Sequence, residues 1–279
     1  MTIDVGRYGI WRGHWGLSPE FAAEAEALGY GAIWIGGSPD GDLALAESML
    51  DATERIVIAT GIVNMWKTPA DAVAPSYHRI AAKHPDRFLL GVGIGHPEAT
   101  AEYRSPYATM VDYLDRLDAA DVPAAGRALA ALGPKALRLS ADRTAGAHPY
   151  LTTPEHTREA RTIIGDGVLL APEQKVVLDT DADRARSVGR PVVARPYLGL
   201  VNYRSNLLRL GWSESDLDDG GSDALIDALV AHGEVESVAA RLTAHLDAGA
   251  DHVCAQVLTA DDADPLPALR ELATALKLG

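Results

Sequence analysis

The sequence has a single cysteine, Cys254, and therefore lacks a disulfide framework. One cysteine is typical of a protein from a reducing compartment, so we expect a cytoplasmic location. No apolar run approaches the roughly 18 residues that a membrane-spanning helix needs. The N-terminus also lacks the basic, apolar and cleavage-site succession of a signal peptide. These absences disfavour disulfide-rich, secreted and membrane-spanning proteins.

Positive charge is scarce as well. The chain has 25 Lys and Arg residues against 39 Asp and Glu residues, which gives a net charge of −14. Such a balance disfavours nucleic acids and membrane surfaces as partners. An anionic small molecule is still possible, because a local basic cluster can hold one. We expect a small-molecule substrate, no nucleic acid and no membrane.

Several enzyme motifs are absent too. There are no paired cysteines and no HExxH, so no metal site is predicted. A GxSxG nucleophile elbow and a GxxxxGK[ST] phosphate loop are also lacking. The glycines of residues 91–95 have the wrong spacing for a GxGxxG dinucleotide site. These absences favour a cofactor that carries the chemistry itself, with the protein supplying orientation.

Strands and helices alternate along the first part of the chain. Four buried strands are predicted, and a helix follows each of the first three: strands at 5–11, 32–35, 56–63 and 88–94, and helices at about 19–28, 42–52 and 70–84. Such alternation implies parallel pairing through right-handed crossovers. A length of 279 residues suits a (β/α)8 TIM barrel, which typically takes about 250 residues. We therefore predict an α/β fold with a single barrel domain over residues 1–279.

The second half has a less regular pattern. The predicted strands are 127–132, 146–150, 167–171, 174–178 and 252–258. The predicted helices are 107–120, 136–142, a helix from 154, a long helix over 191–212 interrupted by Pro196, 235–248 and 266–278. Residues 213–222 are expected to form an acidic loop.

Glycines end two of the predicted strands. Gly61 closes the third strand, and Gly93 and Gly95 close the fourth, directly before His96. Glycine lets a backbone approach a ligand closely because it has no Cβ. Ligands of parallel α/β sheets bind at the carboxyl ends of the strands. The pattern therefore predicts a binding site for a flat cofactor.

The chain resembles the bacterial luciferase-like family, and specifically its coenzyme F420-dependent oxidoreductase branch. The resemblance lies in the order and spacing of five segments, 24–36, 59–64, 90–96, 130–146 and 242–258. It implies a (β/α)8 barrel, a flavin or deazaflavin at the carboxyl end of the barrel, and a homodimer.

The resemblance also implies a shelf behind one face of the cofactor ring. In the family a bulge after the third strand, often with a non-prolyl cis peptide, supplies it. The matching positions are Thr60, Gly61 and Ile62, with Asn64 at the end of the segment. The alternative interpretation is that Gly61 merely ends a strand.

The end of the fourth strand supplies further candidates. Gly93 and Gly95 are expected to let the cofactor pass close to the backbone, and His96 is the candidate catalytic residue. A histidine suits proton transfer to or from a substrate. Relatives carry an acidic residue here, and Glu98 is a nearby alternative. His96 is otherwise a loop histidine before a proline.

An anion site is predicted where Gly133, Pro134 and Lys135 lead into a helix that contains Arg138. A helix N-terminus offers free N–H groups and the positive end of the helix dipole. His148, at the end of the next strand, is expected on the other side of a bound phosphate. The alternative is a simple βα turn with solvated basic residues.

Aromatic side chains follow the first and third strands. Trp11 and Trp66 are expected to wall a substrate pocket, together with His14. Packing in the core or at the rim is the alternative for both tryptophans.

The sequence thus predicts an oxidoreductase that transfers a hydride between coenzyme F420 and an organic substrate. Three alternatives stay open: an FMN-dependent luciferase-like monooxygenase, a non-catalytic flavin- or deazaflavin-binding protein, and a metal-free barrel lyase or isomerase.

Overall fold

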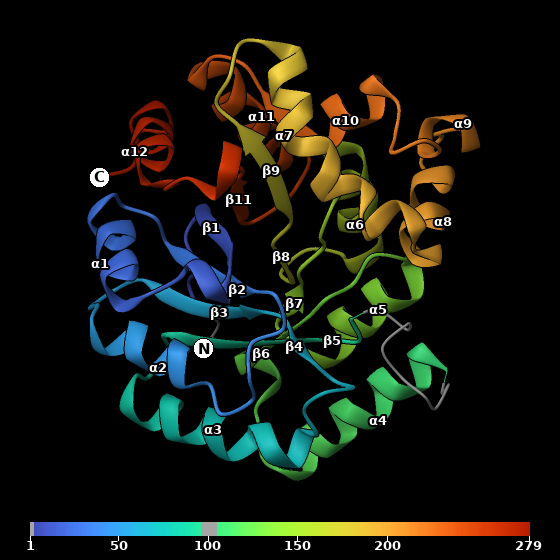
Figure 1. The fold of residues 1–279 in the computed structure, drawn as a ribbon. Coiled ribbons are helices and arrows are strands. Elements are labelled where there is room, and N and C mark those ends of the chain that lie inside the picture. Colours follow the sequence, from blue (N-terminus) through green and yellow to red (C-terminus); the bar gives the residue numbers. More distant parts are fainter. Residues whose placement is uncertain (1–2, 96–104) are drawn as a thin grey trace.

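The structure, a computed structural model, describes residues 3–95 and 105–279. Strands lie at its centre and helices surround them (Figure 1). The strands are β1 (Tyr8–Gly13), β2 (Ala32–Gly36), β3 (Val57–Gly61), β4 (Val63–Asn64), β5 (Phe88–Gly93), β6 (Arg127–Leu129), β7 (Gly146–Ala147), β8 (Leu169–Leu170), β9 (Glu173–Val177), β10 (Val230–His232) and β11 (Val253–Val257).

The helices alternate with these strands. They are α1 (Pro19–Ala27), α2 (Ala44–Asp51), α3 (Ala70–Lys83), α4 (Pro106–Ala119), α5 (Pro134–Arg143), α6 (Pro154–Ile164), α7 (Ala182–Ala194), α8 (Val201–Arg209), α9 (Glu214–Leu217), α10 (Asp223–Leu229), α11 (Val235–Asp247) and α12 (Leu266–Ala275). Short 3-10 turns are η1 (His14–Gly16), η3 (Ala124–Gly126), η4 (Tyr197–Gly199) and η5 (Ala260–Asp262).

All strand pairings are parallel. The path runs β10-β9-β11-β1-β2-β3-β5-β6-β7-β8, and β4 pairs with β5 beside it. Within residues 3–95 and 105–279 no ladder joins β8 to β10, so the path is open. The N–H of Asp251 nevertheless donates to the carbonyl of Leu170 at 3.0 Å, which ties the start of β11 to β8. The predicted parallel α/β fold is confirmed, whereas strand pairing does not establish a closed (β/α)8 barrel.

The first three strands end in register. Gly13 of β1 pairs with Gly36 of β2, and Gly36 pairs with Gly61 of β3. Because β2 and β5 are buried along their whole length, their sequences are continuous apolar runs, as expected for parallel strands covered on both faces. The row of glycines therefore lies at the carboxyl edge of the sheet, where ligands of α/β folds bind.

The helix predicted over 191–212, with an interruption at Pro196, is partly confirmed: α8 lies inside these bounds, but the part before Pro196 belongs to a separate helix. Helix α7 begins earlier, at Ala182, and ends before a cis peptide bond between Arg195 and Pro196. Proline lacks an N–H and disfavours the helical conformation of the residue before it. The chain then forms the turn η4 and starts α8 at Val201.

The predicted loop over 213–222 contains a short helix instead. Ser213 caps α9, and the Asp216 side chain accepts from the Ser213 N–H in return. Helix α10 and strand β10 follow and were not predicted. A strand of three residues carries too little periodicity to be seen in sequence, and its pairing with β9 forms only in the fold.

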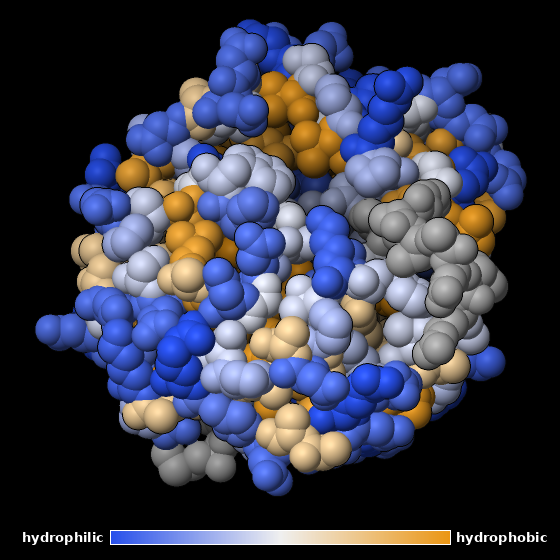
Figure 2. All heavy atoms as spheres, turned by 60° about the horizontal axis from the view of Figure 1, so that its bottom comes forward, coloured by the Kyte–Doolittle hydropathy of each residue, from blue (hydrophilic) through white to orange (hydrophobic). Residues whose placement is uncertain are grey.

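None of the helices that the structure describes is long and apolar enough to cross a membrane. The face shown in Figure 2 is mostly hydrophilic, and hydrophobic side chains gather around a hollow above its centre.

Candidate functional site

A cleft with a volume of about 370 Å³ lies at the carboxyl ends of the strands. This size suits a small-molecule site. Its described lining is mostly apolar or aromatic and includes no Lys, Arg, Asp or Glu. The lining residues are Trp11, Trp15, Gly37, Ser38, Gly61, Ile62, Asn64, Ile94, Gly95, Pro106, Met110, Ala130, Ala131, Leu132, Gly133, Ala136, His148, Tyr150, Tyr197, Asn202 and Tyr203.

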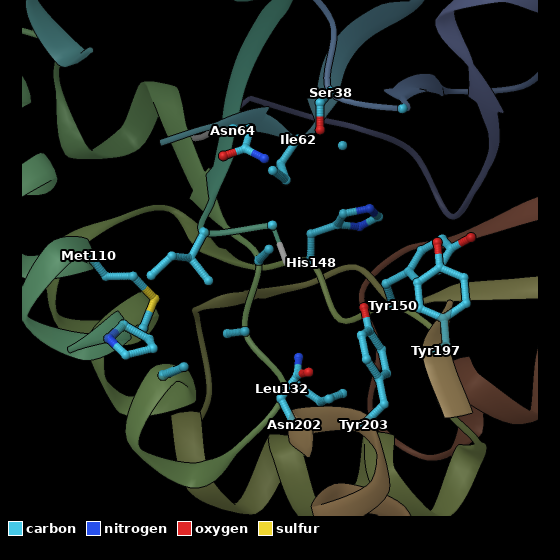
Figure 3. A pocket seen from close by; sticks show the side chains of 18 of the residues that line it. Ser38, Ile62, Asn64, Met110, Leu132, His148, Tyr150, Tyr197, Asn202 and Tyr203 are labelled. Carbon is cyan, nitrogen blue, oxygen red and sulfur yellow. The ribbon is translucent and has the colours of Figure 1, made fainter. Parts of the chain in front are cut away.

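The side chains of the cleft come from distant parts of the chain. In Figure 3, Ile62 and Asn64 lie across the cleft from Leu132 and Asn202, and His148 points into the space between them. The sheet brings these segments together because the carboxyl ends of parallel strands share one edge.

The floor of the cleft depends on the row of glycines. A Cβ at Gly36 would stand 2.0 Å from Cζ2 of Trp11, so Gly36 leaves room for the indole ring. Trp11 is buried and crosses the end of β2 toward Gly61, where a Cβ would stand 3.0 Å from its Nε1. The small residues thus fix where Trp11 lies.

Strand β3 ends at Gly61, one of the positions that the family resemblance matched to the shelf of the cofactor ring. The peptide bond between Gly61 and Ile62 is cis. Thr60 is buried, and its hydroxyl donates to the carbonyl of Gly91 at 2.7 Å. Gly61 and Ile62 both line the cleft, so this peptide forms part of its wall.

His148 is a buried histidine, and its two ring nitrogens differ in their contacts. Nδ1 lies 2.7 Å from the carbonyl of Ala171, whereas Nε2 has no hydrogen-bond partner among residues 3–95 and 105–279. The ring stacks on Trp34 with centroids 4.0 Å apart and an interplanar angle of 8°. Burial lowers the pKa of His148 to about 4, so the imidazole is neutral at physiological pH.

A second buried histidine holds the stack in place. Nε1 of Trp34 donates to Nε2 of His252 at 3.1 Å, and Nδ1 of His252 lies 2.8 Å from the carbonyl of Gly6. A carbonyl oxygen only accepts hydrogen bonds, so Nδ1 of His252 must be the donor and its Nε2 the acceptor in these two hydrogen bonds. His252 therefore fixes Trp34, and the stacked ring of Trp34 in turn fixes the orientation of His148.

An aromatic wall of four residues continues from Trp11. The ring centroids of Trp11 and Tyr150 are 5.1 Å apart, and those of Tyr150 and Tyr197 are 5.2 Å apart. The centroids of Tyr197 and Tyr203 are 5.0 Å apart. Burial raises the pKa of Tyr150 well above its ordinary value, so its hydroxyl stays protonated and donates to Gln256 at 2.9 Å. This wall suits an apolar or planar ligand.

A buried ion pair lies behind the wall. Nζ of Lys175 is 3.1 Å from Oε1 of Glu173, and both side chains are fully buried. The ammonium also lies 3.8 Å from the ring centroid of Tyr150, a favourable cation–π geometry. Within residues 3–95 and 105–279 no group of three or more His, Cys, Asp or Glu side chains is placed to hold a metal ion.

The structure brings seven of the predicted site residues to the cleft. These are Trp11, Gly61, Ile62, Asn64, Gly95, Gly133 and His148. His96, the predicted catalytic residue, lies outside the described residues. The roles assigned to all of these residues stay predictions.

The other predicted site residues do not line the described cleft. They are Thr60, Gly93, Pro134, Lys135, Arg138, His14 and Trp66. Gly93 packs against Ala130 and Ile62, where a Cβ would stand within 2.9 Å of both side chains. Lys135 and Arg138 are exposed on α5. The sequence of the turn does not show which side of the following helix faces solvent, so the exposure of both basic side chains could not be predicted from it.

Sequence reasoning missed part of the cleft. Met110 lies in the helix predicted over 107–120 and was given no site role, and Tyr197, Asn202 and Tyr203 were placed inside a long helix. Pro196 was predicted to interrupt that helix, and the signal not used was Gly199, the last residue of the turn η4 that follows Pro196.

The model of the luciferase-like monooxygenase family matches residues 14–121. The resemblance to the luciferase-like family is thereby confirmed. No curated protein matches the chain.

Solved structures share the fold over nearly the whole chain. One is an F420-dependent secondary alcohol dehydrogenase in complex with an F420–acetone adduct, with a TM-score of 0.73, 14% identity and 99% of each chain covered. Another is the F420-dependent tetrahydromethanopterin reductase from Methanopyrus kandleri, with a TM-score of 0.69, 16% identity and 98% of each chain covered. A third is the oxygenating constituent of 3,6-diketocamphane monooxygenase from Pseudomonas putida in complex with FMN, with a TM-score of 0.68, 13% identity and 98% of each chain covered.

Proposed function

We propose that the protein is an oxidoreductase that transfers a hydride between coenzyme F420 and an organic substrate. The observation that carries this proposal is the cleft itself, which has an aromatic wall, the Gly61–Ile62 peptide in its lining, and buried polar nitrogens with no partner among the described residues. F420-dependent enzymes among the proteins of similar fold support it. A closed (β/α)8 barrel and a cytoplasmic homodimer remain parts of the same proposal.

The residues of the cleft fit the ring of a flavin or deazaflavin. Such a ring has apolar faces and polar edges. Tyr150 and Ile62 offer apolar contacts, and unpartnered nitrogens of Trp11 and His148 offer polar ones. When bound, the cofactor would supply the acceptor or donor of the hydride.

The chain's own residues would then bind and orient the cofactor ring and exclude water from it. The peptide of Gly61 and Ile62 would support one face of the ring. The aromatic wall would keep water from the reacting atoms. His96, outside the described residues, remains the proposed group for a substrate proton.

The alternative is an FMN-dependent monooxygenase of the same fold. The FMN-bound structure of similar fold and the description of the family model favour it. Anaerobic titration of the purified protein with F420 and, separately, with FMN decides between the two, because the bound cofactors absorb at different visible wavelengths. We expect saturable binding of F420 and loss of its oxidised band when a suitable substrate is added.

A matched pair of variants locates the binding. Ala136→Trp fills the cleft and should abolish cofactor binding. Ala125→Trp fills a second hollow, near Tyr77 and Phe88, and should leave binding unchanged. Binding of FMN alone would favour the monooxygenase. Binding of F420 without turnover of any substrate tested would favour a carrier, and binding of neither would overturn both cofactor proposals.

A further inference from the structure

Two buried nitrogens border the same small space at the floor of the cleft. If Gly61 carried a Cβ, that atom would stand 3.0 Å from Nε1 of Trp11 and 3.1 Å from Nε2 of His148. Neither nitrogen has a hydrogen-bond partner in the described chain. Buried polar groups in native proteins are nearly always paired, so these two call for a ligand.

The hydrogen-bonding character of the two nitrogens is fixed. Nδ1 of His148 must donate to the carbonyl of Ala171, so Nε2 of the neutral ring is an acceptor. The indole Nε1 of Trp11 is a donor only. The site thus presents one acceptor and one donor, beside the Gly61–Ile62 peptide.

We propose that His148 and Trp11 bind the imide edge of the cofactor's pyrimidinedione ring. The ring N–H donates to Nε2 of His148, and the neighbouring ring carbonyl accepts from Nε1 of Trp11. This inference rests on the proposed function. Flavin and deazaflavin share this edge, so the assignment holds for either cofactor.

The position of the two nitrogens favours a ring edge over a substrate hydroxyl. A hydroxyl presents its donor and acceptor on one atom, whereas the imide presents them on neighbouring atoms. Trp11 and His148 come from different strand ends, on either side of Gly61, next to the peptide against which a planar ring would lie. A planar edge reaches both nitrogens while its face rests on that peptide.

The two nitrogens are closed off from water in this conformation. We therefore expect the indole of Trp11 to shift when a ring binds, which changes tryptophan emission. The change should be smaller in Trp11→Phe, where Trp15 and Trp34 are the tryptophans left near the cleft.

The test compares 5-deaza-FMN with its N3-methyl derivative, and FMN with N3-methyl-FMN, in binding titrations. Methylation removes the ring N–H. In the wild-type protein we expect N3-methylation to weaken binding about tenfold, the effect of one lost hydrogen bond to a buried group. In His148→Phe, both members of a pair should bind equally, at the weaker level.

Trp66→Phe is the matched control for Trp11→Phe. Nε1 of Trp66 is also buried without a partner, but Trp66 does not line the cleft. Trp11→Phe should weaken binding of the unmethylated rings, and Trp66→Phe should not. If His148→Phe fails to fold, the methylated and unmethylated rings still test the assignment on the wild-type protein.

The outcomes separate this inference from the proposed function. If the wild-type protein binds none of F420, 5-deaza-FMN and FMN, the proposed function fails and the inference with it. If it binds a ring but N3-methylation has the same effect in the wild type and in His148→Phe, the inference is wrong while the function stands. The inference is also wrong if Trp11→Phe and Trp66→Phe bind alike.

Discussion

At the scale of single residues, the shape of the cleft depends on glycines, which have no Cβ. Gly36 lies against the indole of Trp11, with only 2.0 Å between Cζ2 and the place of a Cβ. No real Cβ contact is that short, so any larger residue must move the ring. Trp11 begins the aromatic wall, and a shift there would reach Tyr150.

We expect Gly36→Ala to destabilise the protein by about 1–3 kcal/mol, because overpacking forces buried rings out of their favoured positions. It should also weaken binding of the cofactor ring. Urea unfolding and a binding titration measure the two effects. The control is Gly199→Ala, where a Cβ would meet nothing within 4 Å. If both variants matched the wild type, Gly36 would not determine the position of Trp11.

At the scale of elements, one carboxylate links α1 to the start of β3. Oxygens of Glu26 accept from the N–H groups of Glu54, Arg55 and Ile56, at distances from 2.6 to 3.1 Å. Burial raises the pKa of Glu26, but these three donors outweigh it and hold the pKa below the ordinary value of 4.5. The charged form is therefore the one that the fold stabilises.

The stabilisation by Glu26 should depend on pH in a defined direction. Because its folded pKa is lowered, its contribution is complete above pH 4.5 and disappears as the pH falls through the folded pKa. We expect Glu26→Gln to reduce the free energy of unfolding by about 1 kcal/mol at neutral pH, allowing for partial exposure. The gap should narrow as the pH falls below 4.5, as followed by urea unfolding at neutral and at acidic pH.

Glu24→Gln is the matched control for this prediction. Glu24 is exposed on the same helix, and its side chain pairs with the exposed Arg270. Such a surface pair contributes little, so this variant should resemble the wild type at both pH values. An equal loss in Glu24→Gln would show that the effect is one of helix charge in general.

At the scale of the whole molecule, an acidic protein surrounds an uncharged cleft. The net charge is −14, and the described lining of the cleft carries no basic side chain. Phosphate-bearing cofactors are anions, so the overall field of the protein repels them. Among the described residues, the ring contacts and backbone groups of the cleft are then the expected source of affinity.

This charge distribution predicts the effect of salt on binding. Salt screens repulsion between charges beyond a Debye length of about 10 Å at 0.1 M. The affinity for F420 or FMN should therefore stay constant or rise as sodium chloride is increased, in titrations at fixed pH. A fall in affinity would instead assign the phosphate to basic residues such as Lys135 and Arg138.

The regular elements near the amino terminus were predictable because their signals are local. Ser18 and Pro19 open α1, and the Ser18 hydroxyl accepts from the N–H of Phe21 as a helix cap should. The non-prolyl cis peptide between Gly61 and Ile62 lies at the positions that the family resemblance matched. Around Pro196 the apolar periodicity predicted one helix over 191–212. The structure instead has the turn η4 there, followed by the separate helix α8.

The sequence alone determined the alternation of strands and helices, the parallel α/β class and the likeness to luciferase-like proteins. These depend on hydrophobic runs, caps and glycines that act over a few residues. Only the tertiary structure decided which side chains meet in the cleft. His148, Tyr150 and Tyr203 join Trp11 there because register and crossover geometry set their positions, and the unpartnered state of a buried nitrogen depends on everything packed around it.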